Sequence, residues 1–133
     1  MSSFRTALTG YGRYRGRQGH TSFLMHRITG LGTLLFLAIH ILDTATIAFN
    51  PSLYMDVIAI YRSTAFGILE IGLVFCVLFH GANGLKIAFF DLLAPKSWNI
   101  PSERASFFWT FGAALVFFIP AVLLMVQNML GLR

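Results

Sequence analysis

Long apolar runs separated by short polar turns make up most of the chain. A helix rises about 1.5 Å per residue, so about 20 apolar residues cross the hydrocarbon core of a bilayer. Three runs are long enough, and they cover residues 28–49, 65–93 and 105–132. Turn-forming residues follow the first run at Asn50-Pro51-Ser52 and the second run within residues 94–102. The pattern predicts an all-α membrane protein with three transmembrane helices.

The two connections between these runs differ in character. Residues 50–64 include a stretch, 51–63, that is too short and too polar to span, and we expect it to form a short helix at the membrane surface. Residues 94–104 contain Ser102 and Glu103, a pair suited to capping the third helix. Pro120 lies within the third run, where a membrane helix tolerates a proline.

The composition supports a membrane protein and excludes other classes. Of the 133 residues, 56% are hydrophobic and 11% are charged, whereas soluble domains average about 45–50% apolar and about 25% charged residues. A soluble domain of this size could not bury so much apolar surface. The same figures exclude a disordered chain and a coiled coil. The single cysteine, Cys76, cannot form a disulfide within the chain.

The net charge of +5 is distributed as in a membrane protein, so no nucleic-acid partner is expected. The second connection carries Lys96 and Arg104, whereas the first has only Arg62. Because Lys and Arg favour the cytoplasmic side, we expect residues 1–27 in the cytoplasm and the C-terminus outside a bacterial inner membrane. Residues 1–20 have no apolar core, which argues against a cleavable signal. Five arginines precede the first run with no acidic residue among them: Arg5, Arg13, Arg15, Arg17 and Arg27.

Polar and small residues are concentrated in the first two runs, while the third is almost uniformly apolar. Small residues allow helices to approach closely in a membrane. The first two helices therefore face something more polar than lipid, and we expect a second membrane subunit to complete the helical bundle.

Histidines at membrane depth are the main candidates for function, because an ionisable group there costs at least about 2.5 kcal/mol on insertion scales. His80 is followed one turn later by Gly84. Imidazole is a usual ligand of haem iron, and a glycine one turn away leaves room for the porphyrin edge. A histidine hydrogen-bonded between two helices fits this spacing equally well.

His40 is the second deep histidine, but it does not share the depth of His80. Counted from the inner ends of their runs, His40 lies roughly 20 Å deep and His80 roughly 16 Å. Counted from the outer ends, the depths are about 14 Å and about 22 Å. Two axial ligands of one iron need nearly the same depth. Either each histidine pairs with a ligand from another subunit, giving two haems, or only one of them binds haem.

The first helix opens with Ser22 and the run His26-Arg27-Ile28-Thr29-Gly30. One explanation of His26-Arg27 is that its positive charge anchors this end of the helix at the cytoplasmic side of the membrane. The other is that Arg27 donates hydrogen bonds to a quinone carbonyl or a haem propionate, because its planar guanidinium is permanently charged. Ser22 and Thr29 could add hydroxyl groups to such a site.

Two motifs resemble those of the cytochrome b membrane subunit of succinate dehydrogenase. The run at 26–30 is similar to the His-Arg-[Ile/Val/Leu]-[Ser/Thr]-Gly signature that opens the first helix of that family. The run His80-x-x-x-Gly84-Leu-Lys86, followed by Asp91, resembles its haem helix, usually written His-x-x-x-Gly-Ile-Arg-His-x-x-x-Asp.

The chain departs from the family pattern at three places. Lys86 stands where arginine is common, and Ile87 where many relatives have a second histidine. The quinone serine of the family lies three residues before the motif histidine, where this chain has Phe23, with Ser22 one residue earlier.

The resemblance implies a membrane anchor of a succinate:quinone oxidoreductase, which itself oxidises no succinate. Its partners would be a second membrane anchor, an iron–sulfur subunit and a flavoprotein subunit, within a complex that can form a higher oligomer. Haem b, one or two per complex, and a quinone near the inner surface would receive the electrons. The implied residues are His80, with His40 for an outer haem, as axial ligands; His26, Arg27 and Lys86 near a propionate or the quinone; and Ser22, Thr29, Arg27 and Asp91 as quinone-site candidates.

Two alternatives stay open at this stage. One is a haem-free anchor of the same complex with a purely structural role. The other is a chain that works without dehydrogenase subunits, either a transmembrane b-type cytochrome or a small transporter subunit.

Overall fold

The computed structural model describes residues 18–97 and 99–132, which are almost entirely helical. The arginines expected to mark the cytoplasmic side at positions 5, 13, 15 and 17 lie outside these residues. Three of the helices are long and apolar enough to cross a membrane, which confirms the predicted fold class. The elements in chain order are α2 (Gln18–Phe49), α3 (Pro51–Tyr61), α4 (Thr64–Leu92), the short 3-10 helix η1 (Pro95–Ser97) and α5 (Ile100–Met129).

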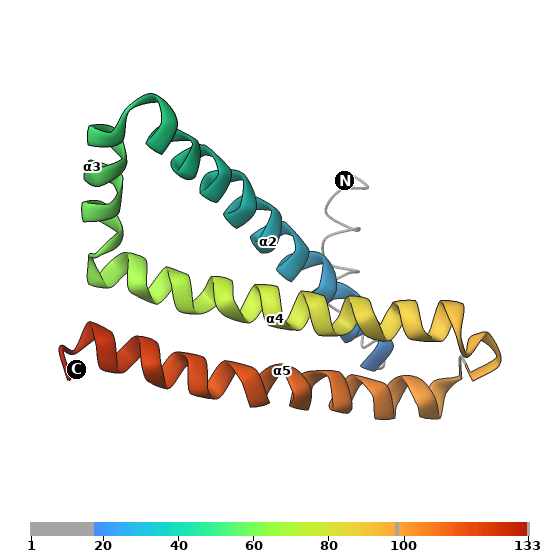
Figure 1. Ribbon diagram of the computed structural model, residues 1–133. Coiled ribbons are helices and arrows are strands. Elements are labelled where there is room, and N and C mark those ends of the chain that lie inside the picture. Colours follow the sequence, from blue (N-terminus) through green and yellow to red (C-terminus); the bar gives the residue numbers. More distant parts are fainter. Residues whose placement is uncertain (1–17, 98, 133) are drawn as a thin grey trace, which may run out of the picture.

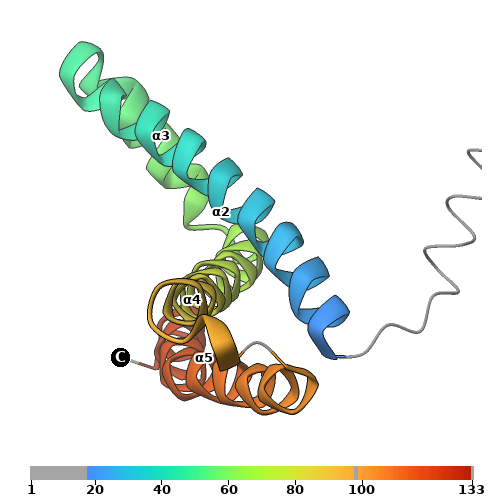
Figure 2. The same ribbon diagram turned by 90° about the vertical axis from the view of Figure 1, so that its right-hand side faces the viewer.

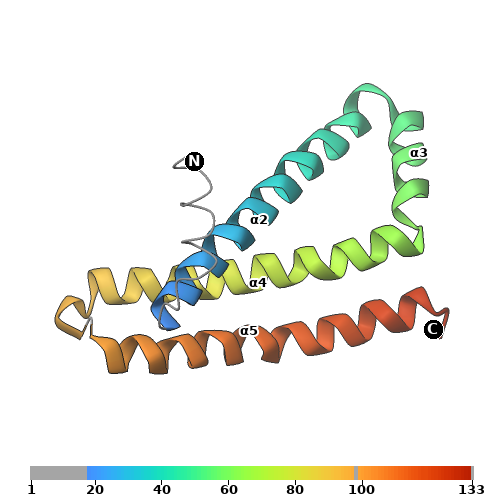
Figure 3. The same ribbon diagram turned by 180° about the vertical axis from the view of Figure 1, so that it is seen from behind.

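The helices α4 and α5 run antiparallel and side by side (Figure 1). The helix α2 crosses α4 near the end of the bundle at which η1 lies, called the η1 end below, and diverges from α4 towards its own C-terminus (Figures 1 and 3). The short helix α3 spans the resulting gap back to the start of α4. Viewed along α4 and α5, α2 leans away from both (Figure 2).

Asparagine side chains cap the helices that follow the two connections. The side chain of Asn50 accepts a hydrogen bond from the Leu53 amide at 3.2 Å, and Pro51 follows at the first helical position. This confirms the short helix predicted after the first run. At α5 the cap is Asn99, whose side chain accepts from the Ser102 amide at 3.0 Å.

The predicted start of α5 at Ser102 and Glu103 was therefore too late. Pro101 lies in the first turn, where its missing amide N–H has no intrahelical partner to lose, so the helix can begin before the proline. The helix α2 already includes the residues from Gln18 onwards, ahead of the first apolar run, and Ser22 in this added stretch is buried. The helix α5 continues through Pro120.

Contacts between the helices rely on aromatic and small side chains. Phe75 packs between α4 and α5, with ring centroids 5.3 Å from Phe118 and 6.4 Å from Phe111. Gly32 lets α2 approach α4, because a Cβ there would lie 2.9 Å from the Cys76 sulfur. Most large apolar side chains of α2 and α5 remain exposed, which fits helices that contact lipid or another subunit.

Candidate functional site

The crossing of α2 and α4 brings His26 and His80 into contact. Their rings stack with centroids 4.1 Å apart and planes 9° from parallel. The Nδ1 of His80 lies 3.1 Å from the backbone oxygen of His26. Because a carbonyl oxygen only accepts, this contact requires the proton on Nδ1, and in the neutral imidazole the lone pair is then on Nε2. The tautomer set by this contact is one that can coordinate a metal ion through Nε2.

Glycines shape the space around both imidazoles. A Cβ on Gly30 would lie 2.8 Å from Cε1 of His80, so only glycine at this position lets the imidazole lie against α2. A Cβ on Gly84 would lie 3.7 Å from Cε1 of His26, an ordinary contact distance. Gly84 therefore borders the imidazole of His26 in this structure.

A buried polar network lies one turn further along α4. The hydroxyl of Ser22 donates to Oδ1 of Asn83 at 2.7 Å, and the ammonium of Lys86 donates to Ser22 Oγ at 3.0 Å. Ser22 is 3% exposed and Asn83 is 1% exposed. Within the described residues, Nδ2 of Asn83 and Nδ1 of His26 are buried without a hydrogen-bond partner. These two atoms could bind an oxygen or a proton donor that another molecule supplies.

The other residues predicted for this end lie apart from the network. The hydroxyl of Thr29 is buried but donates to the Met25 carbonyl of its own helix at 2.7 Å. Arg27 is exposed, and its guanidinium lies 4.8 Å from the centroid of the Phe23 ring. Asp91 is exposed near the end of α4.

The structure does not bring His40 to His80. His40 is exposed and stacks on Phe36 of its own helix, with centroids 5.4 Å apart. His80 contacts α2 at Gly30, and His40 lies about 15 Å further along that helix. This separation agrees with the depth estimate, which places His40 nearer the outer face than His80.

At the opposite end of the bundle, the hydroxyl of Tyr61 donates a hydrogen bond to the carboxylate of Asp43. This hydrogen bond, together with some desolvation, raises the pKa of Tyr61. The contact ties α3 to α2, so Asp43 has a structural partner within this chain.

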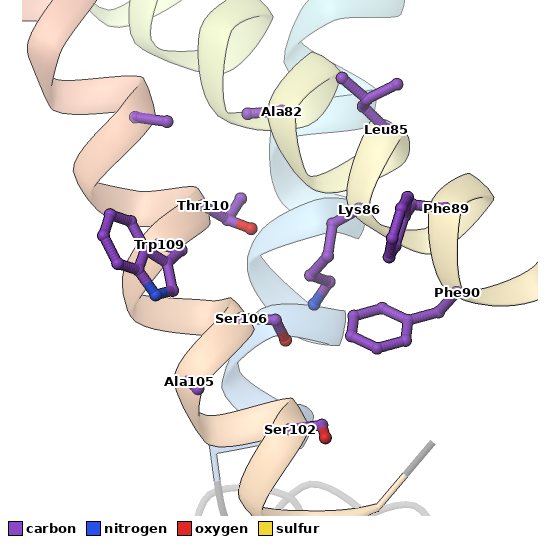
Figure 4. A pocket seen from close by; sticks show the side chains of 11 residues that line it. Ala82, Leu85, Lys86, Phe89, Phe90, Ser102, Ala105, Ser106, Trp109 and Thr110 are labelled. Atoms are coloured by element: carbon purple, nitrogen blue, oxygen red, sulfur yellow. The ribbon is translucent and has the colours of Figure 1, made fainter. Parts of the chain in front are cut away.

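A groove of about 560 Å³ opens between α4 and α5 near the η1 end (Figure 4). Lys86 lines it from α4, and Ser102, Ser106 and Thr110 line it from α5. Sequence reasoning missed these three hydroxyl residues and Asn83. The available signal was a spacing of four residues between hydroxyls, which places them on one face of an otherwise apolar helix. The signal for Asn83 was its position three residues after His80 and three residues before Lys86, which places it next to both side chains on the helix surface.

Comparison with known proteins assigns the chain to a family. Residues 2–121 match the family described as succinate dehydrogenase/fumarate reductase transmembrane subunit. The chain is also 35% identical, over 109 residues, to the succinate dehydrogenase 2 membrane subunit SdhC of Mycobacterium tuberculosis (strain ATCC 25618 / H37Rv), a match that covers 81% of this chain and 77% of the relative. Together with the three apolar helices, these matches show that the chain belongs to the family of succinate dehydrogenase/fumarate reductase transmembrane subunits.

Proposed function

We propose that this membrane anchor subunit binds haem b through His80 and helps to form the site at which quinone accepts electrons. The observation that carries the proposal is the contact between Nδ1 of His80 and the His26 carbonyl at 3.1 Å. Histidines that bind a metal commonly donate their other ring N–H to such a carbonyl, which orients the ring and makes Nε2 a better ligand.

The surrounding residues fit a haem in two further respects. Gly30 provides the space in which the His80 imidazole lies. The buried amide of Asn83 lacks an acceptor within the described part of the chain, and the carboxylates and carbonyls of bound cofactors are acceptors. A bound haem would supply one-electron redox chemistry next to the quinone. His80 would hold this haem without His40, which lies about 15 Å further along α2, and any other ligand would come from the second anchor subunit.

For the quinone, we propose Lys86 of this chain as a hydrogen-bond donor and Ser22 as the residue that positions it. Quinone reduction consumes two electrons and two protons, so the ring needs hydrogen-bond donors close to water. The ammonium of Lys86 has three N–H groups, of which one binds Ser22 and two stay available for an oxygen acceptor. Arg27 is exposed at the same end, where it can contact a haem propionate or the quinone. Thr29, whose hydroxyl donates to Met25 of its own helix, and the exposed Asp91 are quinone candidates through the family motifs alone.

The orientation follows from charge. The η1 end carries Lys96 and Arg104, and α2 begins there with Arg27 in its third turn. We propose that this end faces the cytoplasm and receives the iron–sulfur subunit, which is reduced by the flavoprotein subunit. His40 would then lie towards the outer face, where a second haem would bind.

The proposal is tested by counting haem in the purified complex of His80→Ala and His40→Ala variants, using the reduced-minus-oxidised absorption spectrum. We expect His80→Ala to lose one haem per complex, because the iron loses an axial ligand. A loss of haem in His40→Ala would indicate that the complex holds a second, outer haem bound by His40. An unchanged spectrum would indicate that His40 has a structural role. A complex that has no b-type band before mutation would favour the haem-free anchor.

A further inference from the structure

The groove between α4 and α5 has the size and lining of a small-molecule site. Its volume of about 560 Å³ falls within the range of about 300–1,000 Å³ typical of ligand pockets. Most of its surface is apolar, with aromatic side chains from Phe89, Phe90 and Trp109. The ammonium of Lys86 and the hydroxyl of Thr110 are among its few polar groups (Figure 4). An apolar pocket with a few placed donors is what a flat, lipid-soluble ligand requires.

Thr110 differs from other hydroxyl residues of these helices. It is only 7% exposed, yet its hydroxyl makes no hydrogen bond within the described part of the chain, and its oxygen points towards Lys86 in Figure 4. Because this hydroxyl lines the groove, it is available to donate to an acceptor that a ligand in the groove supplies. The hydroxyls of Thr29, Thr33, Thr44, Thr46 and Ser106 all donate to a carbonyl of their own helix.

Lys86 connects the groove to the buried network on the other side of α4. It lines the groove and donates to Ser22 at 3.0 Å, while Ser22 in turn donates to Asn83 at 2.7 Å. Ser22 therefore uses its only proton within the chain. Its role is to position Lys86, and the donors left for a ligand are the two remaining N–H groups of Lys86 and the hydroxyl of Thr110.

We infer that this groove holds the quinone ring, with Lys86 and Thr110 donating hydrogen bonds to its oxygens and the aromatic side chains flanking the ring. The inference rests on the proposed quinone function and adds α5 to a site that the sequence motifs had placed on α2 and α4. Negative charge develops on the quinone oxygens during reduction, and the ammonium of Lys86 stabilises it. A phospholipid phosphate fits less well, because Lys96 and Arg104 do not line the groove.

The first test compares Thr110→Val with Thr33→Val in the intact complex, using a short-tailed benzoquinone as the acceptor. Each rate is divided by the rate of succinate oxidation with an artificial dye, which measures the amount of assembled complex. We expect Thr110→Val to raise the KM for the quinone about fivefold, the loss typical of one uncharged hydrogen bond. Thr33→Val removes a hydroxyl that binds its own helix at 2.8 Å, so its KM should not change.

The second test blocks the groove. Ala105 is exposed and lines the groove, whereas Ala88 is exposed and lies outside its lining. We expect Ala105→Phe, but not Ala88→Phe, to raise the quinone KM and to reduce labelling of α5 peptides by a photoreactive azidoquinone.

Three outcomes separate the possibilities. Unchanged quinone kinetics in both Thr110→Val and Ala105→Phe, or azidoquinone label confined to α2, would overturn the groove assignment while leaving the quinone function intact. Loss of bound phospholipid with normal quinone kinetics would also overturn it and would identify a lipid site. A complex that reduces the dye but no quinone before mutation would instead contradict the proposed function itself.

Discussion

Single atoms decide the environment of the candidate haem ligand. His80 lies against Gly30 and stacks on His26, and its Nδ1 contacts the backbone of α2. Two glycines near this imidazole are not equivalent. Gly81 adjoins His80 in the sequence, but a Cβ there would meet nothing within 4 Å, whereas a Cβ on Gly30 would lie 2.8 Å from Cε1 of His80. The position of the ring therefore depends on the residue at 30 and not on the residue at 81.

This contrast predicts opposite effects of two alanine substitutions. Gly30→Ala should displace the His80 ring and lower the haem affinity of the complex on the order of tenfold, as changes to the groups that orient a metal ligand do. Gly81→Ala should retain full haem and raise helix stability by up to about 1 kcal/mol, because alanine favours the helix. Haem titration and the melting temperature of each purified complex are the measurements. Equal haem affinity in the two variants would contradict the packing described for Gly30.

At the scale of helices, the capping residues determine where each element begins. The helix α5 starts after Asn99, whose side chain accepts from the Ser102 amide at 3.0 Å, rather than at the Ser102–Glu103 pair favoured from the sequence. Both sites look like caps in a linear reading, because serine and asparagine are equally good N-cap residues. Proline in the first turn, at Pro101, makes the earlier start possible.

Two substitutions separate these cap assignments. Asn99→Ala should lower the stability of the complex by about 1 kcal/mol, because an amide at the start of α5 loses its acceptor. Ser102→Ala removes a side chain that does not cap the helix, so it should leave the melting temperature nearly unchanged. Thermal unfolding of the two purified complexes measures both effects. A larger loss in Ser102→Ala would return the cap to the position predicted from the sequence.

As a whole, the chain is an open arrangement of helices and not a closed bundle. Among the described residues, Phe79 and Ala114 are the buried hydrophobic side chains, and α2 diverges from α4 and α5 (Figure 2). Apolar side chains therefore contact lipid or another subunit over most of the molecule, as expected for one membrane subunit of a succinate dehydrogenase. We propose that the basic residues of the η1 end set the orientation of the molecule across the membrane, because Lys and Arg favour the cytoplasmic side.

Reporter fusions test that orientation. A fusion after Leu132 should give active alkaline phosphatase and a dark green fluorescent protein, because the proposed outer face lies there. A fusion after Ser97, in the connection with Lys96, should give the opposite pair of results. We expect this pair of results because the excess of Lys and Arg at the η1 end favours the cytoplasmic side for that end. Phosphatase activity at Ser97 with fluorescence at Leu132 would reverse the assignment of the two faces.

The sequence alone determined the number of membrane helices, the short helix after the first run and the family. These properties depend on local features, namely the length of apolar runs, the turn residues and two short motifs, so they can be read along one chain. The separation of His40 from His80 was also predictable, because helix rise converts sequence position into depth.

Only the tertiary structure decided which side chains share a site. The stacking of His26 on His80, the Ser22–Asn83–Lys86 network and the open hydroxyl of Thr110 depend on how α2, α4 and α5 cross and rotate about their axes. Helices that are apolar on most faces carry little periodic signal for that rotation. Close contacts at glycines set it instead, through atoms that lie far apart in the sequence.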